Sequence, residues 1–85
     1  MASFTWSVST PEGTVASGSA EYVVIPTARG ELGVMAEHAA LVTLVTAGVL
    51  RITSGGAVRT LPVGPGIAEV RDNAVRLLLS STPPG

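Results

Sequence analysis

Hydrophobic and polar residues alternate with a period of two along most of the chain, which is typical of half-buried β-strands. Near the N-terminus, Phe4, Trp6 and Val8 alternate with residues that carry hydroxyl groups. Further strands are predicted over residues 21–26, 41–45, 48–53, 57–61, 67–71 and 74–79. Many short strands at such close spacing predict an all-β sandwich or barrel.

Two short polar segments are predicted to form hairpin turns. Ser54-Gly55-Gly56 separates the strands 48–53 and 57–61, and glycine accepts the positive φ angles that such turns require. Asp72-Asn73 separates the last two strands, and both residue types tolerate the left-handed region. These four strands are therefore expected to pair with their neighbours in the chain.

Residues 35–41 depart from the strand pattern, because Met-Ala-Glu-His-Ala-Ala-Leu is rich in helix formers. Gly33 precedes this segment, and the β-branched Val42 and Thr43 follow it. A long helix is excluded by these flanking residues. We therefore expect at most a short helical turn near residues 35–41.

The length of 85 residues and the mass of 8.5 kDa fit a single domain. We expect residues 3–80 to form its ordered core and residues 80–85 to form a Pro-rich tail. The hydrophobic fraction of 46% and the charged fraction of 13% exclude a disordered chain. Ala39–Leu50, the longest stretch without charge, is much shorter than the roughly 20 residues of a membrane span, which argues against direct membrane insertion.

The charged residues are few and of mixed sign. Five arginines, no lysine and six acidic residues give a net charge of -1 and no cationic surface for nucleic acid. The folded surface is expected to measure about 4,600 Å², so charged residues occur at about half their usual density. A surface with so little charge suits either a weakly charged soluble domain or a domain partly covered by partners.

Candidate catalytic or metal-binding groups are scarce, so we expect neither an enzyme nor a cofactor or metal site. There is no cysteine, His38 is the only histidine and Asp72 is the only aspartate. No serine is marked as the nucleophile of a triad, and the carboxylates lack metal-ligand spacing. Glu31, Glu37 and His38 fit either a solvated loop or a polar contact point on a loop that faces a partner.

Several motifs, in order and spacing, resemble the N-terminal domain of the epsilon subunit of F-type ATP synthases. They include Gly-Glu-Leu-Gly-Val at residues 30–34, His38-Ala39 and Gly-Val-Leu-Arg-Ile at residues 48–52, and residues 4–9 resemble the family's first strand. Gly-Pro-Gly-Ile-Ala-Glu-Val at residues 64–70 and Asn-Ala-Val at residues 73–75 are similar to later family motifs. The resemblance covers nearly the whole chain, from about Phe4 to Leu79.

The resemblance implies a β-sandwich of two roughly five-stranded sheets. It implies a non-catalytic subunit of the central stalk, or rotor, that links the gamma subunit to the c-ring and couples proton- or sodium-driven rotation to ATP synthesis. Such a subunit is peripheral to the cytoplasmic face of the bacterial inner membrane and is attached through the c-ring. The alternative is a free-standing β-sandwich module that binds a protein or a ligand. A small hydrolase built around His38 has almost no support in the sequence.

The resemblance also assigns contact residues. Glu31 and His38 match family positions in a loop that faces the c-ring loops and the base of gamma. Ala39, Thr43 and Glu69 match positions on the gamma-facing side, and Val49 matches by residue type alone.

The sequence departs from the family pattern in the loop before His38 and at its end. Ala36-Glu37 replaces the Pro-Gly before the histidine, and Ala40 and Ala47 replace two further prolines. Most family members continue into a pair of helices that inhibit ATP hydrolysis, whereas this sequence stops at Gly85 after Pro83-Pro84. The expectation from sequence is therefore a coupling subunit without the C-terminal helical hairpin.

Overall fold

The computed structural model describes residues 2–81, and that part of the chain contains nine β-strands and no helix. The strands are β1 (Phe4–Thr10), β2 (Gly13–Ala20), β3 (Tyr22–Thr27), β4 (Gly30–Met35), β5 (Leu41–Val45), β6 (Gly48–Ser54), β7 (Ala57–Val63), β8 (Gly66–Arg71) and β9 (Ala74–Leu79). The predicted all-β class is confirmed. Because residues 2–81 form only strands, turns and loops, no membrane-crossing helix occurs among them.

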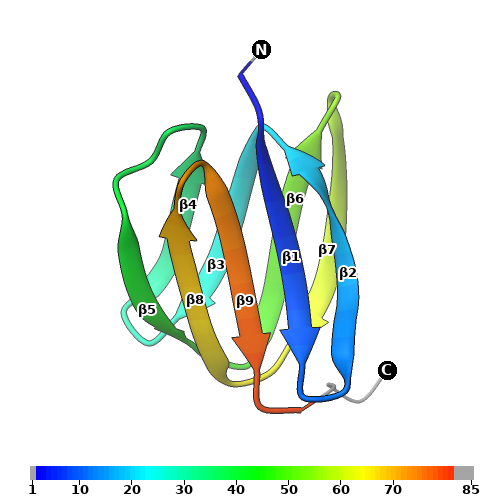
Figure 1. The fold of residues 1–85 in the computed structure, drawn as a ribbon, viewed down its shortest axis with the longest axis vertical. Coiled ribbons are helices and arrows are strands. Elements are labelled where there is room, and N and C mark those ends of the chain that lie inside the picture. The colour runs from blue at the N-terminus through cyan, green and yellow to red at the C-terminus, as the bar shows by residue number, and fades with distance from the viewer. Residues whose placement is uncertain (1, 82–85) are drawn as a thin grey trace.

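The strands form two layers that face each other across a common core (Figure 1). One layer has the order β2-β1-β9-β8-β5, and the other has the order β4-β3-β6-β7. All strand pairs are antiparallel except β1 with β9, which lie parallel. The layers join where Thr27 of β3 pairs with Val45 of β5. The fold is thus a sandwich of a five-stranded and a four-stranded sheet, close to the predicted pair of five.

The core consists of the side chains that alternate along each strand and point between the layers. Ile25, Leu50 and Leu77 are fully buried, and the exposed fraction of Trp6 is 4%. Fully burying one such side chain stabilises the folded state by about 1.5–3 kcal/mol. Among residues 2–81, no polar or charged residue is buried. Hydrophobic burial by alternating side chains therefore holds the two layers together.

Seven of the nine strands match the predicted runs within two residues at each end. The strand pattern did not identify β2 and β4, which lie at the edges of their sheets. β2 is rich in glycine and serine, and Ala20 is its one buried residue. Its strand form comes from main-chain pairing with β1 along its whole length. β4 is held in the same way by β3, so neither strand needs a regular hydrophobic pattern.

Both predicted hairpin turns are confirmed. Gly55 and Gly56 have φ angles of +58° and +80° and connect β6 to β7 as a two-residue turn. Asp72 and Asn73 have φ angles of +52° and +56° and connect β8 to β9 in the same way. Positive φ at both central positions gives the twist that matches paired antiparallel strands.

The segment near residues 35–41 contains a β-turn rather than a helical turn. The His38 N–H donates to the Met35 carbonyl oxygen at 3.3 Å. Glu37, the third residue of this turn, has a φ of +60°, which no right-handed helix contains. Residues 36–40, hereafter the 36–40 loop, then lead into β5. Of the predicted Pro-rich tail, residues 82–85 lie outside the described residues.

Gly66 and Gly33 offer a matched test of how closely the backbone is packed. A Cβ atom at Gly66 would clash with the main chain of Leu78 and Leu79, whereas one at Gly33 would meet the phenol of Tyr22. The main chain of Leu78 and Leu79 is fixed by strand pairing and cannot move away, whereas the exposed Tyr22 side chain can rotate. Gly66→Ala should lower the free energy of unfolding by about 2–3 kcal/mol, and Gly33→Ala by less than about 1 kcal/mol. Urea denaturation measures both free energies of unfolding. An equal decrease in the two variants would contradict this packing argument.

Candidate functional site

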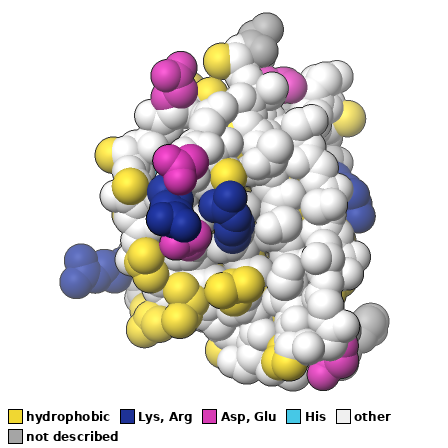
Figure 2. Space-filling view, viewed as in Figure 1, with side chains coloured by type: hydrophobic (Ala, Val, Ile, Leu, Met, Phe, Trp, Pro, Cys, Tyr) yellow, Lys and Arg dark blue, Asp and Glu magenta, His cyan; other side chains and the backbone are white. Residues whose placement is uncertain are grey.

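Four large hydrophobic side chains are exposed on the outer face of the five-stranded sheet. We call Val42, Leu44, Ile67 and Leu78 the apolar band; their exposed fractions are 69%, 65%, 44% and 56%. Leu44 pairs with Ile67, which pairs with Leu78, so the band crosses β5, β8 and β9. In Figure 2, hydrophobic side chains form a row low on this face. A contiguous exposed apolar row is a feature of protein interaction sites.

A group of charged side chains lies beside the apolar band on the same sheet. The Glu69 carboxylate forms ion pairs with two arginines, with Arg71 Nε at 3.5 Å and Arg76 Nη1 at 3.6 Å. Glu69 pairs across the strands with both Val42 and Arg76, which places this group next to the band (Figure 2). Exposed ion pairs contribute at most about 1 kcal/mol each to stability. Their main effect is to place a polar rim beside an apolar surface, as in protein interfaces.

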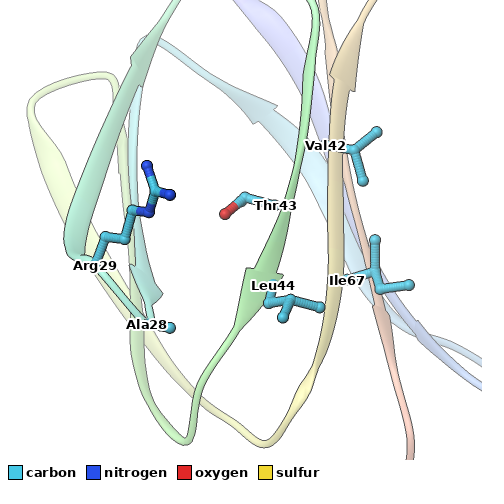
Figure 3. Close-up of a pocket in the computed structure, with 6 residues that line it drawn as sticks. All are labelled: Ala28, Arg29, Val42, Thr43, Leu44 and Ile67. Carbon is cyan, nitrogen blue, oxygen red and sulfur yellow. The ribbon is translucent and has the colours of Figure 1, made fainter.

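A surface groove extends from the apolar band toward the turn between β3 and β4. It has a volume of about 480 Å³ and is lined by Ala28, Arg29, Val42, Thr43, Leu44 and Ile67. Figure 3 shows the Thr43 hydroxyl on the side of β5 that faces Arg29, while Val42 and Ile67 point the other way. Arg29 forms no ion pair within residues 2–81. This edge therefore offers a free cation beside apolar side chains.

The outer face of the four-stranded sheet carries a separate ion pair. The Arg51 guanidinium on β6 donates to the Glu31 carboxylate on β4 at 3.2 Å. Both side chains are about half exposed. Exposed hydrophobic residues also occur on this layer, and Val49 is 47% exposed. This face is thus distinct from the one that carries the apolar band.

The structure does not bring Glu31 and His38 together. Glu31 is paired with Pro26 in β4, next to the turn at residues 28–29, whereas His38 lies in the 36–40 loop. These two connections lie at opposite ends of β4 (Figure 1). The extended chain from Glu31 to Met35 alone covers roughly 13 Å. The expectation that both residues share one loop is wrong, because the Gly-Glu-Leu-Gly run pairs with β3 as a strand.

The four residues expected on a gamma-facing side do not lie on one face of the sandwich. Glu69 points outward beside the apolar band, and Thr43 points the opposite way from its neighbours on β5 (Figure 3). Ala39 is exposed in the 36–40 loop. Val49 lies on β6, in the other layer.

Sequence analysis did not identify the apolar band as a surface. Leu44 lies in the run Leu-Val-Thr-Leu-Val. Continuous apolar runs do not reveal which alternate set of side chains is buried. The signal that identifies the outward set is the cross-strand register, which places Leu44, Ile67 and Leu78 in one row.

His38 has local contacts rather than a catalytic arrangement. Its Nδ1 atom lies 2.8 Å from the carbonyl oxygen of Ala39. Within residues 2–81, no three histidine or carboxylate side chains come close enough to hold a metal ion. The chemically distinctive features of the described surface are therefore the apolar band, its charged rim and the groove.

Comparison with known proteins gives consistent results. The family model of the ATP synthase delta/epsilon chain β-sandwich domain matches residues 3–83. The ATP synthase epsilon chain of Desulfitobacterium hafniense is 40% identical over 82 residues, which are 96% of this chain and 62% of that protein. The epsilon chain of Desulforamulus reducens is 42% identical over 69 residues, which are 81% of this chain and 52% of that protein. The chain thus spans less than two thirds of the length of these curated relatives.

Solved structures of mitochondrial ATP synthases share the fold. A chain of the Euglena gracilis enzyme, determined with OSCP, F1 and the c-ring, matches 89% of this chain and 49% of its own length, with a TM-score of 0.81 and 23% identity. A chain of the Tetrahymena thermophila central stalk and c-ring matches 91% of this chain and 63% of its own length, with a TM-score of 0.74 and 17% identity.

The apolar band is expected to contribute little to folding. Leu44 is 65% exposed, whereas Leu77 is 1% exposed on the inner face of the same sheet. Leu77→Ala should lower the free energy of unfolding by about 2–5 kcal/mol, because it leaves a cavity. Leu44→Ala should change that free energy by no more than about 0.5 kcal/mol. Urea denaturation of both variants is the measurement. A large decrease in the free energy of unfolding of Leu44→Ala would show that the apolar band stabilises the fold rather than serving as a binding surface.

Proposed function

Since this chain belongs to the ATP synthase delta/epsilon chain β-sandwich family, we propose that it serves in the rotor of an F-type ATP synthase as a non-catalytic subunit. In this role it links the gamma subunit to the c-ring and transmits rotation between them. No bond is made or broken on it, so it needs binding surfaces rather than a reactive centre. The match over residues 3–83 is the observation that carries this proposal.

The apolar band is the surface proposed to bind the gamma subunit. A subunit that transmits torque must be held by an interface that does not dissociate during rotation. Stable interfaces bury about 800 Å² on each partner and combine an apolar centre with a polar rim. The apolar band supplies such a centre, and Glu69 with its two arginines supplies the rim. Thr43 adds a hydroxyl group at the groove beside the band.

The two ends of β4 are proposed to contact different parts of the rotor. Arg29 and Glu31 lie at one end and present a free cation and a half-exposed carboxylate. These charges suit the polar loops of the c-ring, where charge complementarity fixes orientation more than affinity. His38 and Ala39 lie at the other end and are assigned to the gamma subunit. Val49, on the other layer, is assigned to a separate part of the gamma surface.

The cellular location follows from the proposed assembly. An ATP synthase is a membrane-associated complex, and the epsilon chains named above belong to such complexes. We place this chain on the cytoplasmic face of the bacterial inner membrane. There it is peripheral, and its contact with the membrane sector runs through the c-ring.

Binding to gamma tests the role of the apolar band. Ile67→Asp puts a charge in the middle of the band and should weaken the complex with the cognate gamma subunit at least tenfold, equivalent to about 1.4 kcal/mol. Val15→Asp is the matched control, since Val15 is 50% exposed on β2, a strand that carries none of the assigned contact residues. It should bind gamma like the unchanged protein. Titration calorimetry measures both affinities.

Three results would contradict the proposal in different ways. Equal affinities of the two variants would exclude the band as the gamma-binding surface. Failure of the unchanged protein to bind gamma at micromolar concentration would exclude the rotor function. A stable monomer that instead binds an unrelated peptide would favour a free-standing binding module.

Charge reversal at Glu31 tests the c-ring contact. Glu31→Arg should weaken docking to purified c-ring and lower the rate of proton-driven ATP synthesis, while binding to gamma is unchanged. The substitution also breaks the ion pair with Arg51, so Arg51→Ala serves as the control that removes the pair and keeps the carboxylate. A binding assay with purified c-ring measures docking, and reconstituted synthase in vesicles measures the synthesis rate. A normal synthesis rate in Glu31→Arg, or an equal loss in Arg51→Ala, would contradict the assigned contact.

A further inference from the structure

One side-chain amide connects three segments that are far apart in the sequence. Asn73 Oδ1 accepts the Glu37 N–H at 2.8 Å, and Asn73 Nδ2 donates to the Ser3 carbonyl oxygen at 2.9 Å. The partners are separated from Asn73 by 36 and 70 positions. The main-chain carbonyl of Asn73 also accepts the Thr5 N–H at 3.3 Å. The turn between β8 and β9 is thereby tied both to the start of β1 and to the 36–40 loop.

Asparagine is the residue whose side chain matches both hydrogen bonds at position 73. The Glu37 N–H can only donate and the Ser3 carbonyl can only accept, so the side chain between them needs one acceptor and one donor. An aspartate carboxylate would supply two acceptors and face the Ser3 carbonyl with the wrong polarity. The backbone of Asn73 is left-handed, with a φ of +56°, which asparagine tolerates better than most residues.

The 36–40 loop depends on this contact because its own sequence does not stiffen it. The family motif that the loop resembles has Pro-Gly where this chain has Ala36-Glu37. Proline fixes φ, and glycine adopts positive φ without strain; Glu37 does neither, yet its φ is +60°. Within the described residues, the loop's other hydrogen bonds are local: His38 N–H to Met35, and His38 Nδ1 with Ala39. Ala36 packs against the core, and the hydrogen bond from the Glu37 N–H to Asn73 Oδ1 fixes the strained residue of the turn to a distant segment of the sandwich.

We propose that Asn73 is a positioning residue that holds the 36–40 loop in the shape in which His38 and Ala39 dock on the gamma subunit. In this proposal Asn73 acts through the loop and is not itself assigned as a contact residue. The inference rests on the proposed function for its partner. Figure 1 shows the geometry that makes it possible, since the β8–β9 turn, the loop and the start of β1 lie at the same end of the molecule.

The test separates the side chain of Asn73 from the shape of its turn. Asn73→Gly keeps a residue that accepts positive φ and removes both side-chain hydrogen bonds. Asp72→Gly is the matched control, because Asp72 has a φ of +52° and its side chain makes only an exposed ion pair with Arg71 at 3.9 Å. Asn73→Asp, which keeps the acceptor for Glu37, provides a second variant if Asn73→Gly fails to fold.

Two readouts are compared at a temperature at which all variants are folded. Amide hydrogen exchange of Glu37, followed by NMR, should become at least tenfold faster in Asn73→Gly and stay unchanged in Asp72→Gly. Affinity for the gamma subunit should fall about fivefold or more in Asn73→Gly alone. Asn73→Asp should keep most of the protection of Glu37 and lose the protection of the amides at the start of β1.

The outcomes distinguish this inference from the proposed function. Unchanged exchange of Glu37 in Asn73→Gly would overturn the inference, whatever the affinity. Faster exchange with unchanged affinity, in a protein whose Ile67→Asp variant does lose gamma binding, would overturn the positioning role and leave the rotor function intact. If the unchanged protein does not bind gamma at all, the proposed function fails and the docking role fails with it, while the exchange result still reports on the hydrogen bond.

Discussion

Burial of one alternating set of side chains between two sheets is the constraint on which the rest of this structure depends. The chain has no cysteine, and the described residues bury no polar group that could add a directed bond to the core. Trp6, Ile25, Leu50 and Leu77 must therefore all point inward at once. A shift of one residue in any strand pairing would exchange its inward and outward sets, so the core fixes the register.

The same constraint determines which residues are available for binding. Once the inward set is fixed, Leu44, Ile67 and Leu78 form an outward row that folding does not require. The accessible surface of 4881 Å² carries few charges, and several of these pair with one another around Glu69. Such a surface suits the proposed rotor role, because apolar contact would hold the partner and a few charges would fix its orientation.

The 36–40 loop illustrates how a long-range contact substitutes for local rigidity. A Pro-Gly pair would define the turn before His38 through covalent geometry alone. Ala36-Glu37 forms the turn here even though Glu37 must adopt a left-handed backbone. The compensation comes from Asn73, which lies 36 positions further along the chain and is itself held by the turn between two strands. Order in this loop is thus a property of the folded sandwich and not of the loop sequence.

The sequence by itself determined the all-β class, seven strands, the turns at Gly55-Gly56 and Asp72-Asn73, and the family resemblance. Each of these depends on residues that are close in the chain, such as a period of two or a residue that accepts positive φ. Only the tertiary structure decided the strand form of β2 and β4, the separation of Glu31 from His38, the outward side of Leu44, and the amide bridge of Asn73. These features arise from pairing and packing between distant segments. The pattern of residues within one segment does not specify which distant segment it will contact. The positions of these features are therefore set only when the two sheets pack together.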